Sequence, residues 1–138
     1  TGYIDTNFVG KAECALDELK THDFVYIHVE APDECGHQRD PMGKVKSIEN
    51  IDKMILNPVY EYLQSTNEDF GIMVLPDHPT FIRTGTHAPD PVPYMIYSSK
   101  IEKDGASPFT EKNAAATGIS ISDGSTLMQR FFDICNER

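Results

Sequence analysis

Residues 24–29, with the sequence FVYIHV, form a nearly continuous run of apolar, β-branched and aromatic side chains. Such a run is typical of a strand that is covered on both faces, as strands in parallel sheets usually are. Residues 30–43 follow at once and are rich in proline, glycine and acidic residues, which end a strand and favour a loop. The sequence therefore predicts a central, parallel strand whose carboxyl end opens into a polar loop.

Helices are expected on both sides of this strand. Apolar residues recur at helical spacing over residues 10–20 and again over residues 44–56. The second apolar stripe consists of Val45, Ile48, Ile51, Ile55 and Leu56. The neighbouring Lys44 and Lys46 are expected to face water, and Pro58 is expected to break or restart the helix.

Further strands and helices complete the order of elements. Residues 72–75 and 93–97 predict short strands, residues 111–117 a short helix, and residues 123–135 a closing helix with one apolar face. Because buried strands are interleaved with helices in this order, the sequence predicts an α/β fold with a mostly parallel central sheet and helices on both faces. Ligands of such sheets bind beyond the carboxyl ends of the strands.

The composition describes an acidic globular chain of about one domain's length. Its 138 residues include 22 acidic and 12 basic residues, with a formal net charge of -10 and a pI near 4.8. This charge repels nucleic acid, and it also repels an anionic substrate unless bound cations reverse the local field. No stretch has the apolar length of a membrane span, and three irregularly spaced cysteines suit reduced thiols. These features predict a cytoplasmic protein without nucleic-acid or membrane partners.

Carboxylates and imidazoles follow the predicted strands. Asp33 and His37 come after the first strand, four residues apart, and Asp77 and His78 come directly after the second, with His87 further along the same loop. A mixture of carboxylate oxygens and imidazole nitrogens suits Mn²⁺ or Zn²⁺, with Mg²⁺ a weaker match. Two such ions about 4 Å apart form a clamp for phosphoryl oxygens. The sequence therefore predicts a site for two divalent metal ions at one sheet edge, although solvated loop residues would give the same pattern.

Three nearby residues have more than one interpretation. His28 and Glu30 lie at the end of the predicted strand, where they are either half-buried polar residues or second-shell groups that orient Asp33 and His37. Cys35 lies between two predicted ligands, and a small buried thiol explains it better than a nucleophile or a metal donor.

Three segments together resemble a known family. They are HVEAPDECGH at residues 28–37, LPDHPT at residues 75–80 and HAPDPVP at residues 87–93. In this order they are similar to the motifs of archaeal-type cofactor-independent phosphoglycerate mutases, which belong to the alkaline phosphatase superfamily. The segments TGYIDT at residues 1–6 and FTE at residues 109–111 are also similar.

The resemblance implies a three-layer alkaline-phosphatase-like fold, of which this chain has a part. It implies that Asp33, His37 and His87 bind one metal ion, while Asp77 and His78 help to bind the other. In the family, an aspartate and a serine nucleophile complete the coordination of the second ion. The serine carries the phosphoryl group between the 2- and 3-positions of phosphoglycerate.

No candidate for that aspartate or serine is visible in this chain. We therefore expect residues 1–138 to be the carboxy-terminal part of the metal-binding domain, beginning after the nucleophile and an inserted cap domain. The missing amino-terminal part of the same protein is then an expected partner, and the chain alone is expected to be inactive.

Other functions share these motifs. A homoserine kinase-like phosphotransferase, or another phosphomutase of the alkaline phosphatase superfamily, would use the same ligands with a different phosphoryl acceptor. A non-catalytic domain whose acidic loops bind a cation is an alternative of a different class.

Overall fold

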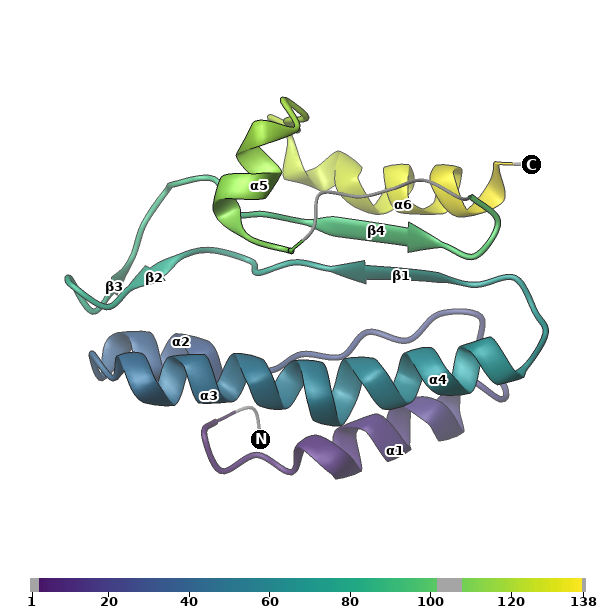
Figure 1. Cartoon of the computed structure of the whole chain (residues 1–138), viewed down its shortest axis with the longest axis horizontal. Helices are drawn as coiled ribbons and strands as arrows, with labels where there is room; N and C mark the ends of the chain where they lie inside the picture. The colour runs from purple at the N-terminus through teal and green to yellow at the C-terminus, as the bar shows by residue number, and fades with distance from the viewer. Residues whose placement is uncertain (1–2, 102–107, 138) are drawn as a thin grey trace. The chain divides into compact units, whose positions relative to one another are not determined.

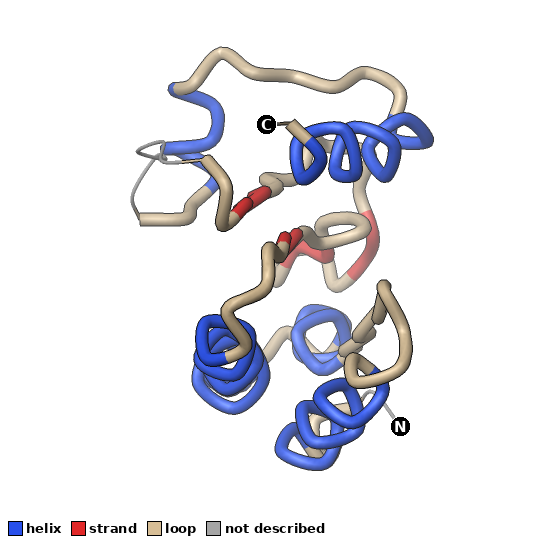
Figure 2. The backbone as a smooth tube through the Cα atoms, turned by 90° about the vertical axis from the view of Figure 1, so that its right-hand side faces the viewer, coloured by secondary structure: helices blue, strands red, loops and turns tan. Residues whose placement is uncertain are grey.

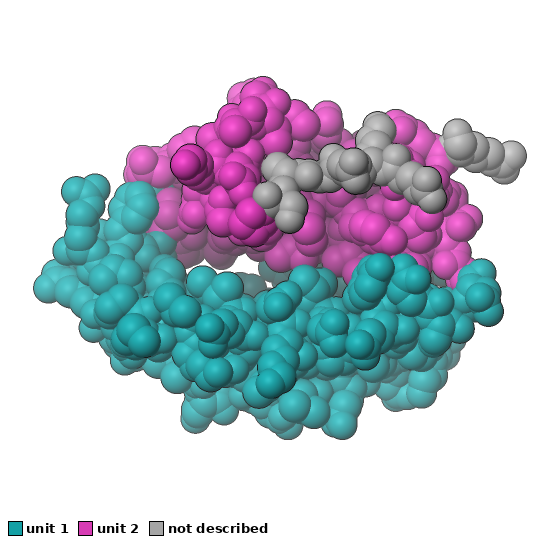
Figure 3. Space-filling model, viewed as in Figure 1, with its two compact units in different colours: residues 1–67, 80–88 teal, residues 68–79, 89–138 magenta. Residues whose placement is uncertain are grey.

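The computed structural model describes residues 3–101 and 108–137. The chain divides into two compact units (Figure 3). Unit 1 consists of residues 1–67 and 80–88, and unit 2 consists of residues 68–79 and 89–138. The chain therefore leaves unit 1, returns to it for a short segment, and leaves it again.

Unit 1 is mainly helical (Figure 1). Its helices are α1 (Phe8–Glu18), α2 (Ala31–His37), α3 (Pro41–Ile51), the π-helical turn η1 (Asp52–Leu56) and α4 (Asn57–Ser65). The predicted helix over residues 10–20 is confirmed by α1, which begins where the side chain of Asn7 accepts a hydrogen bond from the backbone N–H of Gly10 at 2.9 Å. The core of the unit consists of Phe8, Ala31 and Ile55, with Ile27, Val29, Ile51 and Met54 packed against them.

The helical run from α3 to α4 has no gap, but its π-helical turn gives way to the α-helix α4 at Asn57, with Pro58 in the first turn of α4, which agrees with the predicted restart. Proline has no backbone N–H, and its ring clashes with the carbonyl of the residue four positions earlier, which here is Met54. Met54 lies inside η1, where the wider π-helical turn relieves this contact. The π turn thus accounts for one continuous helical run from α3 to α4.

The predicted apolar stripe of this helix is correct only in its second half. Ile55 is buried, but Val45 and Ile48 are each 53% exposed. The side of α3 that faces the protein instead includes Ser47, which is buried, and Lys44, whose ammonium bonds to a backbone carbonyl of unit 1. The prediction that Lys44 faces water is therefore wrong, because a lysine can bury its stem while its charge is hydrogen-bonded.

The predicted central strand at residues 24–29 has no assigned strand structure, and no strand of the described residues pairs with it (Figure 2). Its side chains alternate. Ile27 and Val29 pack against the core, whereas Tyr26 is 70% exposed and Phe24 is also exposed. The segment is thus covered on one side only, and the prediction of a strand covered on both faces is wrong for the described part of the chain.

Four short strands form two separate antiparallel pairs. In unit 1, β2 (Thr80–Phe81) pairs with β3 (Thr86–His87), with Thr80 opposite His87. In unit 2, β1 (Gly71–Val74) pairs with β4 (Met95–Ser98), which confirms the two predicted strands there. The predicted mostly parallel sheet is not seen among the described residues, because both of their ladders are antiparallel.

The helices of unit 2 are α5 (Glu111–Ala116), the 3-10 turn η2 (Gly124–Thr126) and α6 (Leu127–Asn136). Both helices predicted in this region are confirmed. The α6 helix packs closely on β1, because a Cβ atom placed on Gly71 would lie 2.2 Å from the sulfur of Cys135 and 3.1 Å from the ring of Phe131. None of the helices in the described ranges is long and apolar enough to cross a membrane.

Candidate metal centre

The α2 helix supplies the first two side chains of the site. Residues 30–43 were predicted to be a loop, but residues 31–37 form a helix with a proline in its first turn. Proline favours this position because its fixed φ suits a helix start, and Asp33 in the same turn lies near the positive end of the helix dipole. Because residues four apart lie on one helix face, Asp33 and His37 project together.

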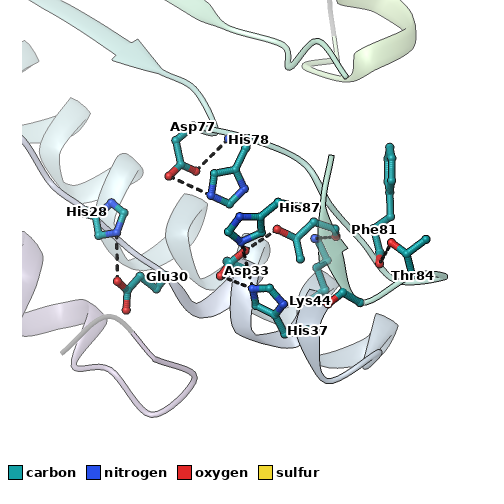
Figure 4. A network of polar contacts seen from close by, with 12 residues as sticks. His28, Glu30, Asp33, His37, Lys44, Asp77, His78, Phe81, Thr84 and His87 are labelled. Carbon is teal, nitrogen blue, oxygen red and sulfur yellow. Dashed lines mark hydrogen bonds and ion pairs between the residues drawn. The ribbon is translucent and has the colours of Figure 1, made fainter. Parts of the chain in front are cut away.

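The hairpin of β2 and β3 brings in His87, as Figure 4 shows. The Nε2 atoms of His37 and His87 are 3.1 Å apart. Nε2 of His37 lies 3.2 Å from Oδ2 of Asp33, and Nε2 of His87 lies 3.3 Å from Oδ1 of the same carboxylate. The structure therefore brings together three of the predicted ligands within unit 1, and their donor atoms form a group that could bind a metal ion.

These distances match the spacing of donor atoms around a metal ion. Ligands with bonds of 2.0–2.1 Å in a tetrahedral arrangement lie about 3.3 Å from one another. The two imidazole nitrogens are 3.1 Å apart, and those of His37 and His87 lie 3.2 and 3.3 Å from the two different oxygens of Asp33, so each of these distances is close to this value. The two nitrogens and the Asp33 carboxylate thus offer donor atoms to one metal ion.

A backbone carbonyl orients His37. Its Nδ1 atom lies 2.9 Å from the carbonyl oxygen of Gly85, in the turn between β2 and β3. Because a carbonyl oxygen only accepts, Nδ1 carries the hydrogen and donates it. In the neutral ring, Nε2 then has a free lone pair directed toward Asp33 and His87, which is the tautomer that a metal ligand needs.

The turn itself depends on Gly85. Its φ of 69° lies in the left-handed region that glycine adopts at little cost. Sequence analysis did not single out Gly85, although a glycine between two polar threonines is a recognisable turn signal.

Asp77 and His78 belong to unit 2, where they come after the strand β1, as predicted, with Leu75 and Pro76 between. The side chain of Asp77 accepts a hydrogen bond from the backbone N–H of His78 at 3.0 Å, and the second carboxylate oxygen lies 3.4 Å from Nε2 of His78. The Asp77 side chain is 67% exposed. Their role as ligands of a second ion stays a prediction.

His28 and Glu30 contact each other. Nε2 of His28 lies 3.5 Å from the Glu30 carboxylate, and its Nδ1 lies 3.4 Å from the hydroxyl of Tyr26. The backbone carbonyl of His28 accepts a hydrogen bond from the Lys11 ammonium at 3.0 Å. These contacts order the chain that leads into α2, while the predicted second-shell role of the pair toward Asp33 and His37 stays a prediction.

Cys35 lies on the side of α2 away from solvent and is completely buried. Burial raises the pKa of its thiol, since the thiolate loses its hydration. A buried thiol with a raised pKa is a poor nucleophile and a poor metal donor. The interpretation of Cys35 as a small buried residue is confirmed.

Comparison with known proteins identifies the family. The model of the metalloenzyme superfamily matches residues 2–132. The chain belongs to the metalloenzyme superfamily, which agrees with its carboxylate and imidazole group in unit 1.

Its relatives include the 2,3-bisphosphoglycerate-independent phosphoglycerate mutase of Methanosarcina barkeri. The two are 44% identical over 129 residues, which are 93% of this chain and 32% of that protein. A second enzyme with this name, phosphoglycerate mutase 2 of Methanothermobacter thermautotrophicus, is 38% identical over 133 residues, which are 96% of this chain and 33% of that protein. The resemblance to cofactor-independent phosphoglycerate mutases is confirmed, and the chain spans about a third of the length of these relatives.

A solved structure of a protein from Pyrococcus horikoshii has the same fold. It superposes with a TM-score of 0.81 at 27% identity, over 100% of this chain and 42% of that one. The predicted fold class, an α/β fold of the alkaline-phosphatase-like type, is confirmed by this likeness. The described residues contain only small parts of a sheet.

Proposed function

We propose that the protein carrying this chain is a metal-dependent phosphoglycerate mutase that interconverts 2- and 3-phosphoglycerate. The observation that carries the proposal is the group of Asp33, His37 and His87. Its two imidazole nitrogens lie 3.1 Å apart and 3.2 and 3.3 Å from the two Asp33 oxygens, in a chain that is 44% identical to a named phosphoglycerate mutase.

The donor set fits a divalent metal ion. It offers one carboxylate oxygen and two imidazole nitrogens and no thiolate, which suits Mn²⁺ or Zn²⁺ better than Mg²⁺. When bound, such an ion supplies positive charge that stabilises the negative oxygens of a phosphoryl group in transfer. The chain itself contributes the negative Asp33 carboxylate and the oriented lone pair of His37.

Asp77 and His78 support a second ion in this proposal. Their carboxylate and imidazole repeat the donor types of the first group, and they lie in the loop after β1. The phosphoryl group is proposed to pass through a serine of the full-length protein, which the resemblance assigns to a part of the family sequence other than these motifs. The substrate is a small phosphate ester of glycolysis, so the proposed location is the cytoplasm.

The test is an assay of the full-length protein with 3-phosphoglycerate and Mn²⁺. Replacement of Asp33 or Asp77 by alanine is expected to reduce kcat by at least about 1,000-fold, since losing roughly 4 kcal/mol of transition-state stabilisation at 1.36 kcal/mol per factor of ten gives this ratio. His22→Ala is the matched control, because His22 is exposed at the end of α1 and contacts Glu18.

Two results would overturn the proposal. Normal mutase turnover by the Asp33 variant would exclude a metal role for this group. Wild-type protein that transfers phosphate from ATP to homoserine, and that does not interconvert the phosphoglycerates, would identify the kinase-like alternative.

A further inference from the structure

We propose that Thr80 is a positioning residue for the metal centre and that its hydroxyl sets the orientation of the Asp33 carboxylate. This inference rests on the proposed metal function of unit 1. Thr80 is the first residue of β2 and is not one of the three residues of the metal-binding group, so its proposed role is to act through Asp33.

Thr80 lies next to ligands from both elements of the site, Asp33 on α2 and His87 on β3. Its buried hydroxyl donates a hydrogen bond to Oδ1 of Asp33. In the antiparallel ladder it lies directly opposite His87. A residue in this place links the carboxylate on α2 to the imidazole on β3. Thr80 thereby fixes the relative positions of two ligands that come from different elements.

Close packing at Gly36 brings Thr80 against α2. A Cβ atom on Gly36 would lie 2.8 Å from both Cγ2 and the carbonyl oxygen of Thr80. Real side chains do not approach so closely, so only glycine allows β2 to lie this near the helix. Gly36 immediately precedes the ligand His37, and any larger residue there would push Thr80 away from Asp33.

Lys44 restrains the backbone of Thr80 in addition to the β3 ladder and the α2 helix. Its ammonium, on α3, donates a hydrogen bond to the carbonyl oxygen of Thr80 at 2.7 Å, and the contact is partly buried. A charged donor makes a stronger hydrogen bond than a neutral one. Thr80 is therefore restrained by a ladder partner, a helix and an ammonium group, as expected for a residue whose hydroxyl must stay in one place.

The hydroxyl determines which way the carboxylate turns. Oδ1 of Asp33 accepts from Thr80 and also lies 3.3 Å from His87, while Oδ2 lies 3.2 Å from His37. Without the hydroxyl, the carboxylate is free to rotate, and its donor atom spends less time at the metal position. Loss of outer-shell partners of this kind typically reduces metal affinity by about 10- to 100-fold.

The first test compares two substitutions of Thr80 in the full-length protein. Mn²⁺ affinity is measured by competition with a chelator. The binding event that disappears in the His87→Ala variant is assigned to the site of Asp33, His37 and His87. Thr80→Val is expected to lower the affinity for this ion by about 10- to 100-fold. The affinity of Thr80→Ser, which keeps the hydroxyl, is expected to stay within about threefold of wild type. Thr84→Val is the control, because Thr84 lies in the same hairpin and its exposed hydroxyl donates a hydrogen bond to the Phe81 carbonyl, at 3.4 Å, and not to a carboxylate of the site.

A second pair of variants keeps the test decisive if Thr80→Val does not fold. Gly36→Ala removes no polar group but displaces Thr80, so we expect it to weaken binding of the same ion. Gly124→Ala should not, because its added Cβ meets no atom of the described residues beyond its own turn within 4 Å. Thermal unfolding of the metal-free variants is measured alongside affinity.

The outcomes separate this inference from the proposed function. If Thr80→Val and Gly36→Ala bind the ion as wild type does and only their metal-free stability falls, Thr80 is a packing residue and the inference is wrong, while the metal centre stands. If wild-type protein has no ion that His87→Ala removes, both the metal centre and the positioning role are wrong.

Discussion

Unit 1 gathers its ligand side chains from segments far apart in the sequence, whereas unit 2 offers two adjacent residues. His37 and His87 of unit 1 are 50 residues apart in the sequence and lie 3.1 Å apart in space. Asp77 and His78 of unit 2 contact each other as any neighbours in a turn can. A group assembled by long-range contacts is strong evidence for a site, because chance rarely keeps three such donors together. Two adjacent residues such as Asp77 and His78 are evidence for a metal site only through the family motif that contains them.

The largest expected effect contrasts one ligand from each unit. His87→Ala removes one of the donors of unit 1, and we expect its ion to bind more than about 100-fold more weakly, beyond the usual effect of outer-shell changes. Asp77→Asn should leave the affinity of that ion within about threefold, since unit 1 has its own donor set. Mn²⁺ titration of the full-length protein with a competing chelator measures both. Equal losses in both variants would show that the two groups build one indivisible site.

An intermediate effect is expected from Gly71→Ala in unit 2. The added Cβ would lie 2.2 Å from the sulfur of Cys135, so the Cys135 side chain or the α6 helix must shift. Overpacking of this kind costs about 1–3 kcal/mol. Denaturant unfolding should register this loss, while the Mn²⁺ affinity assigned to unit 1 stays the same.

Gly124→Ala provides the matched control for this substitution, because its Cβ position has no contact within 4 Å among the described residues beyond its own turn. Wild-type stability of Gly71→Ala would mean that α6 does not pack tightly on β1. A parallel loss of metal affinity would mean that the stability of unit 2 and the unit 1 site are coupled.

The smallest effect concerns the thiols. Cys35 of unit 1 is fully buried, Cys135 of unit 2 is half-buried, and burial raises the pKa of both thiols. The thiolate is the reactive form, so at pH 7 both should react more slowly with iodoacetamide than the exposed Cys14. Cys35 should be the slowest by at least about tenfold, because its reaction requires local opening that costs more than about 1.4 kcal/mol.

Mass spectrometry of the labelled peptides gives the order of reaction, and urea-unfolded protein, in which the three thiols should react alike, is the control. Faster labelling of Cys35 than of Cys135 would show that the interior of unit 1 opens more readily than the edge of unit 2.

The ligand types and their order could be predicted from the sequence because they are local patterns. A carboxylate and an imidazole four residues apart share a helix face or a turn, and either arrangement brings Asp33 near His37. The direct approach of His87 to this pair depends on the hairpin and its docking on α2. Loop order placed His87 at the same predicted site, and only the family motifs assigned it to the same ion as Asp33 and His37. Thr80 was missed for the same reason, since its function depends on three contacts that are distant in sequence.

Fold predictions failed where the structure of a segment depends on contacts with residues distant in the sequence. The apolar run at residues 24–29 has the composition of a buried strand, but a strand also needs a hydrogen-bonded neighbour, and no described strand pairs with it. The inward face of α3 was misjudged because Lys44 finds a carbonyl acceptor on Thr80, which no periodicity reveals. Helix positions, by contrast, followed local spacing and capping, as at Asn7.

The sequence distance between His37 and His87 has a thermodynamic consequence. In the unfolded chain, bringing together the ends of a flexible loop of this length costs about 3.5 kcal/mol from the (3/2)RT ln n term alone. An ion that binds only the assembled ligands acts as a removable cross-link, comparable to a disulfide across the same loop. That loop includes residues 68–79 of unit 2, so the cross-link encloses part of the second unit as well. The resistance of the whole chain to unfolding should therefore rise with the concentration of free metal ion.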